Sequence, residues 1–151
     1  MMHIRAAERR DLDEWTRLRV ALWPDDFEEH LAEADRFFAG DRREPAEVLL
    51  AFDDEGHASG FAELSIRNIV DSCTTDRVAY LEGWYVVPTA RRTGVGAALI
   101  AAAERWALEQ GCTEFGSDSL IDNTASLLAH HALGFEETSR VVTFRKKLDS
   151  R

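Results

Sequence analysis

The stretch VVPTARRTGVGAAL, residues 86–99, joins an apolar run ending in proline to an alanine-rich segment with helical spacing. The turn between them places backbone N–H groups at a helix N-terminus, which attracts anions. Gly94 and Gly96 permit close approach of a ligand, and Arg91 and Arg92 can donate charge-assisted hydrogen bonds. The stretch therefore predicts a binding site for a pyrophosphate.

Two familiar glycine motifs do not fit these residues. A Walker P-loop would require Gly-Lys-Ser/Thr, which the sequence lacks. A dinucleotide fingerprint would require a third glycine near position 99, which is Leu99, and a preceding βαβ unit. The segments before this turn instead predict antiparallel strands, so both alternatives are excluded.

Composition limits the classes of function. The chain has 151 residues, which suits a single domain spanning 1–151. Its formal net charge of −10 argues against a nucleic-acid partner and favours a cationic small molecule, although solubility alone also explains an acidic surface. No apolar stretch is long enough for a signal peptide or a membrane span, so we expect a cytoplasmic protein without a membrane partner.

Cysteine usage and metal-ligand spacing indicate neither a disulfide framework nor a metal site. Cys73 and Cys112 are too few and belong to no C-x-x-C pair, so free thiols are expected. Neither has a sequence neighbour that would activate it as an acyl carrier. We expect no metal cofactor.

Hydrophobic periodicity predicts an α/β domain of the α+β type with a mixed sheet. We expect a capping box from Asp11 to Glu14, a bulge or close backbone approach at Gly83, and an N-cap at Asn123. After Pro24 we expect a helix with a buried stripe of Phe27, Leu31, Ala34 and Phe38. The remaining expected helices begin near residues 11, 94 and 124, and strands are expected at 2–6, 47–52, 57–67, 78–87, 112–118 and 140–148.

The motif Arg91-x-x-Gly94-x-Gly96 after a buried strand resembles the acetyl-CoA site of the GNAT acetyltransferases. A helix that Asn123 opens, with Ser126 in its first turn and Leu-Gly-Phe at its end, resembles the second signature of that family. The resemblance covers residues 2–148. It implies the GNAT fold, a mixed and mostly antiparallel sheet with a central splay between two strands, flanked by about four helices.

Within this family the chain is most similar to the aminoglycoside 6′-N-acetyltransferases, in residues 21–26, 64–73, 80–96, 117–126 and 130–140. That resemblance implies transfer of acetyl from acetyl-CoA, the co-substrate, to the 6′-amine of an aminoglycoside antibiotic. The amine would attack directly in a ternary complex, and the reaction would confer antibiotic resistance. It also implies a homodimer. The strand expected at 140–148 could complete the sheet within one chain or pair across the two-fold axis of the dimer.

The resemblance also assigns contacts with coenzyme A. Val86 and Val87 would lie along the pantetheine arm, and the Val87 N–H would face the developing oxyanion. The implied cofactor-binding residues are Val86, Val87, Arg91, Arg92, Thr93, Gly94, Val95, Gly96, Ala97, Asn123 and Ser126.

Carboxylates are the expected partners of a polyamine acceptor, and one of them would take its proton. Glu82 interrupts an apolar strand, and Asp118 ends the next strand, so both are candidate catalytic and substrate-binding residues. The alternatives for Glu82 are an exposed strand edge or an ion pair with an arginine such as Arg67. The alternative for Asp118 is a role in capping a helix or turn.

Three further residues are candidates. Trp23 and Asp25 would contact the substrate, with core packing and first-turn capping as the respective alternatives. His130 lies where many GNAT enzymes have a tyrosine that protonates the leaving thiolate, and a helix-surface role or a contact with coenzyme A is the alternative.

The coenzyme A signature does not determine the acceptor. A polyamine or protein amine is therefore an alternative substrate, and a non-catalytic module that binds coenzyme A is an alternative function.

Overall fold

The computed structural model describes residues 2–150, which divide after Asp118 into two compact units. The first unit contains β1 (His3–Ala6), the 3-10 turn η1 (Arg9–Asp11), α1 (Leu12–Leu22), α2 (Phe27–Phe38), β2 (Glu47–Phe52), β3 (Ala58–Arg67), β4 (Val78–Val86), the 3-10 turn η2 (Pro88–Ala90), α3 (Val95–Glu109) and β5 (Phe115–Ser117). The second unit contains α4 (Thr124–Ala132).

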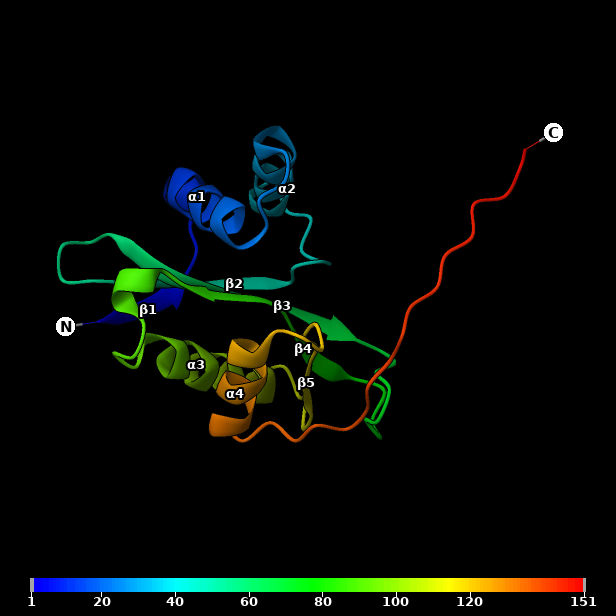
Figure 1. Ribbon diagram of the computed structural model, residues 1–151. Coiled ribbons are helices and arrows are strands. Elements are labelled where there is room, and N and C mark those ends of the chain that lie inside the picture. Colours follow the sequence, from blue (N-terminus) through cyan, green and yellow to red (C-terminus); the bar gives the residue numbers. More distant parts are fainter. Residues whose placement is uncertain (1, 151) are drawn as a thin grey trace. The chain divides into compact units, whose positions relative to one another are not determined.

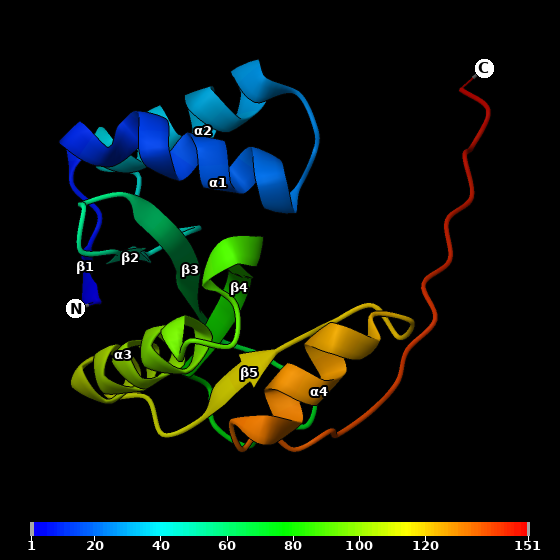
Figure 2. The same cartoon turned by 60° about the vertical axis from the view of Figure 1, so that its left-hand side comes forward.

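The first unit is built on a sheet whose strands lie in the order β1-β2-β3-β4-β5. The first four strands pair antiparallel and β5 pairs parallel to β4, so the expected mixed sheet is confirmed. In Figures 1 and 2, α1 and α2 cover one face of this sheet and α3 covers the other. Strand β3 is buried along most of its length, as expected of a central strand between two helical layers.

The ladder between β4 and β5 is short. It pairs only Ala79–Leu81 with Phe115–Ser117, whereas β4 continues to Val86. In the described part of the chain, no strand lies beside the last residues of β4 on the side that faces β5. This arrangement matches the expected splay between two strands.

The first helix is capped one turn earlier than the sequence predicts. The capping box pairs Glu8 with Asp11, and the Asp11 carboxylate accepts hydrogen bonds from the Glu8 N–H at 2.7 Å and from the Arg5 guanidinium at 2.7 and 2.9 Å. Asp11 makes no side-chain cap for α1 itself. The predicted box from Asp11 to Glu14 is therefore wrong, because Arg5 and the preceding 3-10 turn engage the carboxylate first.

The second helix buries Ala34 of the predicted stripe, and Phe38 packs partly buried against the core. Ala34 is fully buried as expected, but Phe27 at the first position is 51% exposed. The buried residues are His30, Ala34 and Phe37. Asp26 caps the helix by accepting from the Glu28 N–H at 3.0 Å, so Phe27 is its first residue.

A bulge interrupts the pairing of β3 with β4. Glu63 pairs with Gly83 and Leu64 pairs with Leu81, so Glu82 is the extra residue on β4. Gly83 also makes a close approach, since an added Cβ would lie 2.5 Å from Cη2 of Trp23. Both features expected of Gly83 are confirmed.

The second unit begins with an ordered cap. The Asn123 side chain accepts from the Ser126 N–H at 3.1 Å, as predicted, and Gly134 after α4 has the left-handed φ of +91°. The strand expected at 140–148 is wrong: these residues form no strand in the structure, and Val141, Val142, Phe144 and Leu148 are exposed. Alternation alone cannot make a strand, because each strand requires a hydrogen-bonded neighbour.

None of the helices within residues 2–150 has the length and apolar content that a membrane span requires.

Candidate active site

The bulge on β4 brings a carboxylate out of an otherwise apolar strand. Glu82 accepts two hydrogen bonds from Arg67 on β3, from Nε at 3.0 Å and from Nη2 at 2.7 Å. The Glu82 side chain is 15% exposed, so this paired carboxylate is accessible at one edge. The ion pair considered as an alternative for Glu82 is thus present, and it holds the side chain as an oriented anion.

Asp118 joins the same cluster through Tyr80. The Tyr80 hydroxyl donates to Oδ2 of Asp118 at 2.6 Å, and the Arg67 guanidinium lies 3.6 Å from the centre of the Tyr80 ring. Burial, together with the carboxylate beside it, raises the pKa of Tyr80 well above its usual range, so the hydroxyl keeps its proton. Tyr80 and Arg67 therefore connect the two predicted carboxylates.

Trp23 lies on the α1 and α2 side of β4. Its indole contacts the Gly83 backbone, packs edge-on against Phe61 and stacks with the ring of His30 at 6.3 Å between centroids. The indole also lines a pocket of about 210 Å³. The residues around this pocket are Arg19, Trp23, Asp25, Glu29, His30 and Glu33. The Trp23 side chain thus packs against the core and also forms part of the pocket wall. Asp25 lines the same pocket.

The predicted anion site is a helix start without a side-chain cap. Gly94 has the left-handed φ of +90°, which favours glycine, and Arg92 before it has a φ of 64°. The first helical hydrogen bond runs from the Ala98 N–H to the Gly94 carbonyl, so the N–H groups of Val95, Gly96 and Ala97 need other acceptors. These donors suit phosphate oxygens.

Helix packing also requires a glycine at position 96, which the sequence did not indicate. An added Cβ would lie 3.3 Å from Cζ2 of Trp84 on β4, so the missing side chain lets α3 sit close to the strand. Arg91 folds back onto that strand, with its Nε donating to the Val86 carbonyl at 2.9 Å. Thr93 bonds the Ala90 carbonyl through its hydroxyl and closes the turn.

The expected oxyanion donor is wrong. The Val87 N–H donates to the Ser59 carbonyl on β3 at 2.9 Å, so it points away from the side where an oxyanion would bind. Neighbouring residues of a strand direct their N–H groups to opposite sides, which turns the Val86 N–H toward the side that β5 leaves open.

In the second unit, Asn123 and Ser126 form the N-terminal cap of α4, and His130 lies one turn further on. Nδ1 of His130 lies 2.7 Å from the Ser126 carbonyl oxygen, which can only accept, so Nδ1 carries a hydrogen. Nε2 then has a proton to give only when the imidazole is positively charged.

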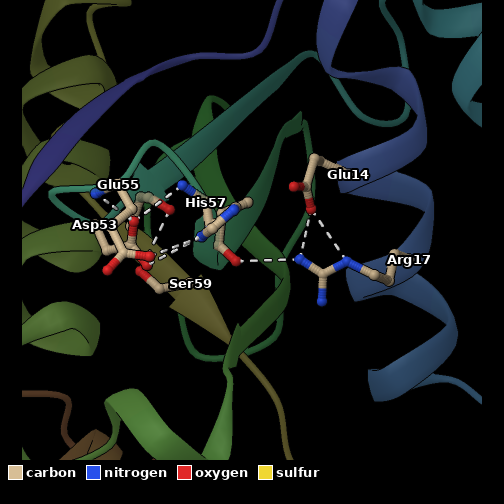
Figure 3. Close-up of polar contacts among 8 residues, drawn as sticks. Glu14, Arg17, Asp53, Glu55, His57 and Ser59 are labelled. Atoms are coloured by element: carbon tan, nitrogen blue, oxygen red, sulfur yellow. Dashed lines mark hydrogen bonds and ion pairs between the residues drawn. The ribbon is translucent and has the colours of Figure 1, made fainter.

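A second hollow, of about 730 Å³, lies between the β2–β3 hairpin and the loop after β4. Figure 3 shows its polar side chains engaged within the fold: Arg17 donates to Glu14 and to the Ala58 carbonyl, and Asp53 accepts from the N–H groups of Glu55 and His57. The His57 N–H is the largest cause of a lowered Asp53 pKa. These groups close the hairpin, as the acidic turn predicts.

Neither cysteine has the environment of a nucleophile. Burial and the neighbouring Glu114 raise the pKa of Cys73, and Cys112 is buried. Across residues 2–150, no three His, Cys, Asp or Glu side chains are grouped so that they could hold a metal ion.

The sequence matches the acetyltransferase (GNAT) family over residues 12–135. The chain belongs to this family. A relative from Klebsiella aerogenes, named aminoglycoside N(6′)-acetyltransferase type 1, is 51% identical over 96% of both chains. A relative of the same name from Salmonella typhimurium is 43% identical over 97% of this chain and 99% of its own.

Solved structures of GNAT acetyltransferases agree with the fold. AAC(6′)-Iy in complex with the bisubstrate analogue CoA-S-monomethyl-acetylneamine has a TM-score of 0.89 and 41% identity, covering 98% of this chain and 99% of that one. The 6′-N-acetyltransferase AAC(6′)-Ih from Acinetobacter baumannii also has a TM-score of 0.89, with 40% identity over 99% and 100% of the two chains.

Sequence reasoning missed Tyr80 and a second buried carboxylate, Glu63. Tyr80 is an ordinary strand residue in sequence, and only the pairing with β5 reveals its hydrogen bond to Asp118. Glu63 did carry a signal, because it interrupts an apolar strand just as Glu82 does.

Proposed function

We propose that this GNAT acetyltransferase transfers acetyl from acetyl-CoA to the 6′-amine of aminoglycoside antibiotics, and so confers resistance. The observation that carries the proposal is the cluster in which Arg67 and Tyr80 hold Glu82 and Asp118 at the splay of β4 and β5. Two carboxylates beside a strand edge that β5 leaves uncovered suit a polycationic acceptor and an extended thioester. The names of the Klebsiella and Salmonella relatives support the same acceptor.

Acetyl-CoA would be held by main-chain groups. The N–H groups of Val95, Gly96 and Ala97 would bind the diphosphate, with the charge of Arg92 adding to the helix dipole. The open side of β4 at Val86 would pair with the pantetheine arm. Arg91, Val87, Thr93 and Gly94 would shape this turn. Asn123 and Ser126, at the start of α4, are further proposed contacts with coenzyme A.

The chemistry would proceed by direct attack in a ternary complex. Asp118 would accept a proton from the 6′-ammonium, directly or through a water molecule, while Glu82 would bind a cationic group of the substrate. The neutral amine would form a bond to the thioester carbonyl carbon, and the carbon–sulfur bond would break as the carbonyl re-forms. The attacking nitrogen would lose its second proton to water, which leaves a neutral amide. The Val86 N–H would stabilise the oxyanion in place of the Val87 N–H.

The departing thiolate needs a proton. His130 would supply it as an imidazolium from Nε2, because Nδ1 is bound to the Ser126 carbonyl. His130→Gln should lower kcat and leave the calorimetric affinity for coenzyme A within about two-fold, whereas an unchanged kcat would assign the proton to water.

Side-by-side assays test the acceptor. Each assay combines acetyl-CoA with one acceptor and follows thiol release. The acceptors are kanamycin, tobramycin, spermidine and a peptide amine, and a 6′-hydroxy aminoglycoside is the matched control. We expect turnover only with the 6′-amino drugs. Thiol release with spermidine or the peptide alone would reject the proposal in favour of the alternative amine substrates, and none with any amine would favour a non-catalytic module.

Variants test the division of labour between the carboxylates. Asp118→Asn should lower kcat by about 100-fold, and Glu82→Gln should chiefly raise KM for the aminoglycoside. Calorimetric affinity for coenzyme A should stay within about two-fold in both variants. Two fully active variants would refute these roles.

We further propose that the chain acts as one acetyltransferase domain in the cytoplasm and as a homodimer. Support for the dimer comes from the tail, where Val141, Val142, Phe144 and Leu148 are 74–93% exposed on an extended, alternating segment. Light scattering should give twice the 17.0 kDa monomer mass, and a chain ending at Thr138 should be monomeric. A full-length chain of monomer mass would refute the dimer.

A further inference from the structure

A buried carboxylate on β3 takes no part in the chemistry proposed above. Glu63 is only 3% exposed. Its Oε2 accepts the indole N–H of Trp15 at 3.0 Å and lies 3.3 Å from Nε of Arg19. A buried ion pair contributes little net stability compared with an apolar replacement, so its presence calls for a role other than stability.

The same guanidinium group of Arg19 also reaches the pocket beside Trp23. Nη2 of Arg19 donates to Oε2 of Glu33 on α2 at 2.6 Å, and its guanidinium carbon lies 5.3 Å from the centre of the Trp23 ring. Arg19 is 6% exposed, whereas the Glu33 side chain is 34% exposed at the pocket wall. Arg19 therefore links a fully buried carboxylate to two residues that line the pocket.

Trp23 is held from three directions. Gly83 lies beneath the indole, Arg19 lies over its ring, and the stacked His30 ring donates from Nε2 to the Trp23 carbonyl at 2.8 Å. Of these supports, Arg19 is the one with a flexible side chain. Its place depends on the carboxylates at its two ends.

We propose that Glu63 is a positioning residue for the aminoglycoside: it holds Arg19 so that Trp23 and Glu33 stand at the wall of the acceptor pocket. This inference rests on the proposed function, in which Trp23 contacts the substrate. Glu63 acts only through Arg19 and does not touch the substrate.

Protonation of Glu63 should weaken this arrangement. Burial raises the pKa of Glu63 to about 7, against the opposing effects of Arg19 and Trp15 on α1. Glu33 on α2 and Glu82 on β4 add to the rise. Below that pH the carboxyl group is neutral and no longer attracts the guanidinium, so the pocket wall loses its support near neutrality.

The test compares wild type with Glu63→Gln, which keeps the shape and an acceptor for Trp15 but removes the charge. We expect KM for tobramycin to rise about ten-fold at about pH 8, with kcat and KM for acetyl-CoA within about two-fold. At about pH 6, where Glu63 of the wild type is largely protonated, the two KM values should converge.

Asp11→Asn is the matched control, because Asp11 is also a buried carboxylate paired with an arginine but lies outside the pocket. It should lower the melting temperature and leave both KM values unchanged. If Glu63→Gln does not fold, Arg19→Lys provides the same KM measurement, and we expect the same selective rise for tobramycin.

Three outcomes separate the possibilities. An unchanged KM for tobramycin in a folded Glu63→Gln or Arg19→Lys variant overturns the inference and leaves the proposed function intact. A rise equal to that in Asp11→Asn, or one that does not vanish at low pH, shows a merely structural role and also overturns it. If wild type acetylates no aminoglycoside, the proposed function fails and the inference fails with it.

Discussion

Replacing Gly83 with alanine tests whether the close packing of Trp23 on β4 controls substrate binding. Gly83 is not in the left-handed region, so the backbone itself accepts alanine. The new Cβ, however, would lie 2.5 Å from Cη2 and 2.9 Å from Cζ2 of the indole. The ring must retreat by about 0.9 Å to reach ordinary contact at 3.4 Å.

That displacement has two measurable costs. Overpacking of this kind typically costs about 1–3 kcal/mol of unfolding free energy, which denaturant titration would detect. A shift of about 1 Å in a positioning group can reduce kcat/KM by up to about 100-fold. We expect kcat/KM for tobramycin to fall by about 10- to 100-fold, while KM for acetyl-CoA stays within about two-fold.

A second substitution isolates the contact with Trp23. In the Gly83→Ala background, Trp23→Leu removes the ring that the new methyl group meets, so the two stability losses should not add. Gly56→Ala, at a hairpin turn with a φ of +82°, is a control that destabilises without touching the pocket. Unchanged tobramycin kinetics in Gly83→Ala, or additive losses in the double variant, would refute the reasoning.

Three further predictions follow from other contacts. Tyr80→Phe removes the donor to Asp118 and should lower kcat about ten-fold or more with unchanged affinity for coenzyme A in calorimetry, whereas full activity would remove Tyr80 from the site. Asn123→Ala loses the cap on the Ser126 N–H and should cost about 1 kcal/mol in denaturant titration; no loss would mean that the cap is not formed. Because the folded pKa of Glu63 is raised from 4.5 to about 7, its ionisation should lower stability by up to about 3 kcal/mol as pH rises through that window, and Glu63→Gln should flatten this part of the profile of melting temperature against pH.

Local patterns were sufficient to predict most elements of the fold. The apolar run of β4, the glycine turn and the periodic helix α3 each depend on neighbours within a few residues, and all three are present. The N-cap at Asn123 is likewise a local signal. Such features can be predicted because the two partners of each interaction lie within a few residues of one another in the sequence.

Features that depend on distant partners were missed or misplaced. Arg5 on β1 binds Asp11 at the end of η1, and the Ser59 carbonyl on β3 accepts the Val87 N–H. Neither outcome follows from the residue pattern around Asp11 or Val87. The tail at 140–148 alternates like a strand but has no neighbour that would make it one.

The candidate site shows the same division. Glu82 was identifiable as a charge within an apolar run, and its bulge was signalled by Gly83. Glu63 gives the same signal in β3, yet its partners lie on α1, which no pattern within the strand reveals. Side-chain type identified the carboxylates, and tertiary contacts decided what each can do.

The early end of β5 at Ser117 has a consequence for engineering this chain. Each residue added to β5 in register would extend the ladder along β4 and occupy the main-chain groups that we propose pair with the thioester arm. An insertion that lengthened β5 should therefore make the protein harder to unfold and unable to accept its acyl donor. In the proposed function, the short β5 ladder is what leaves room for the acyl donor along β4.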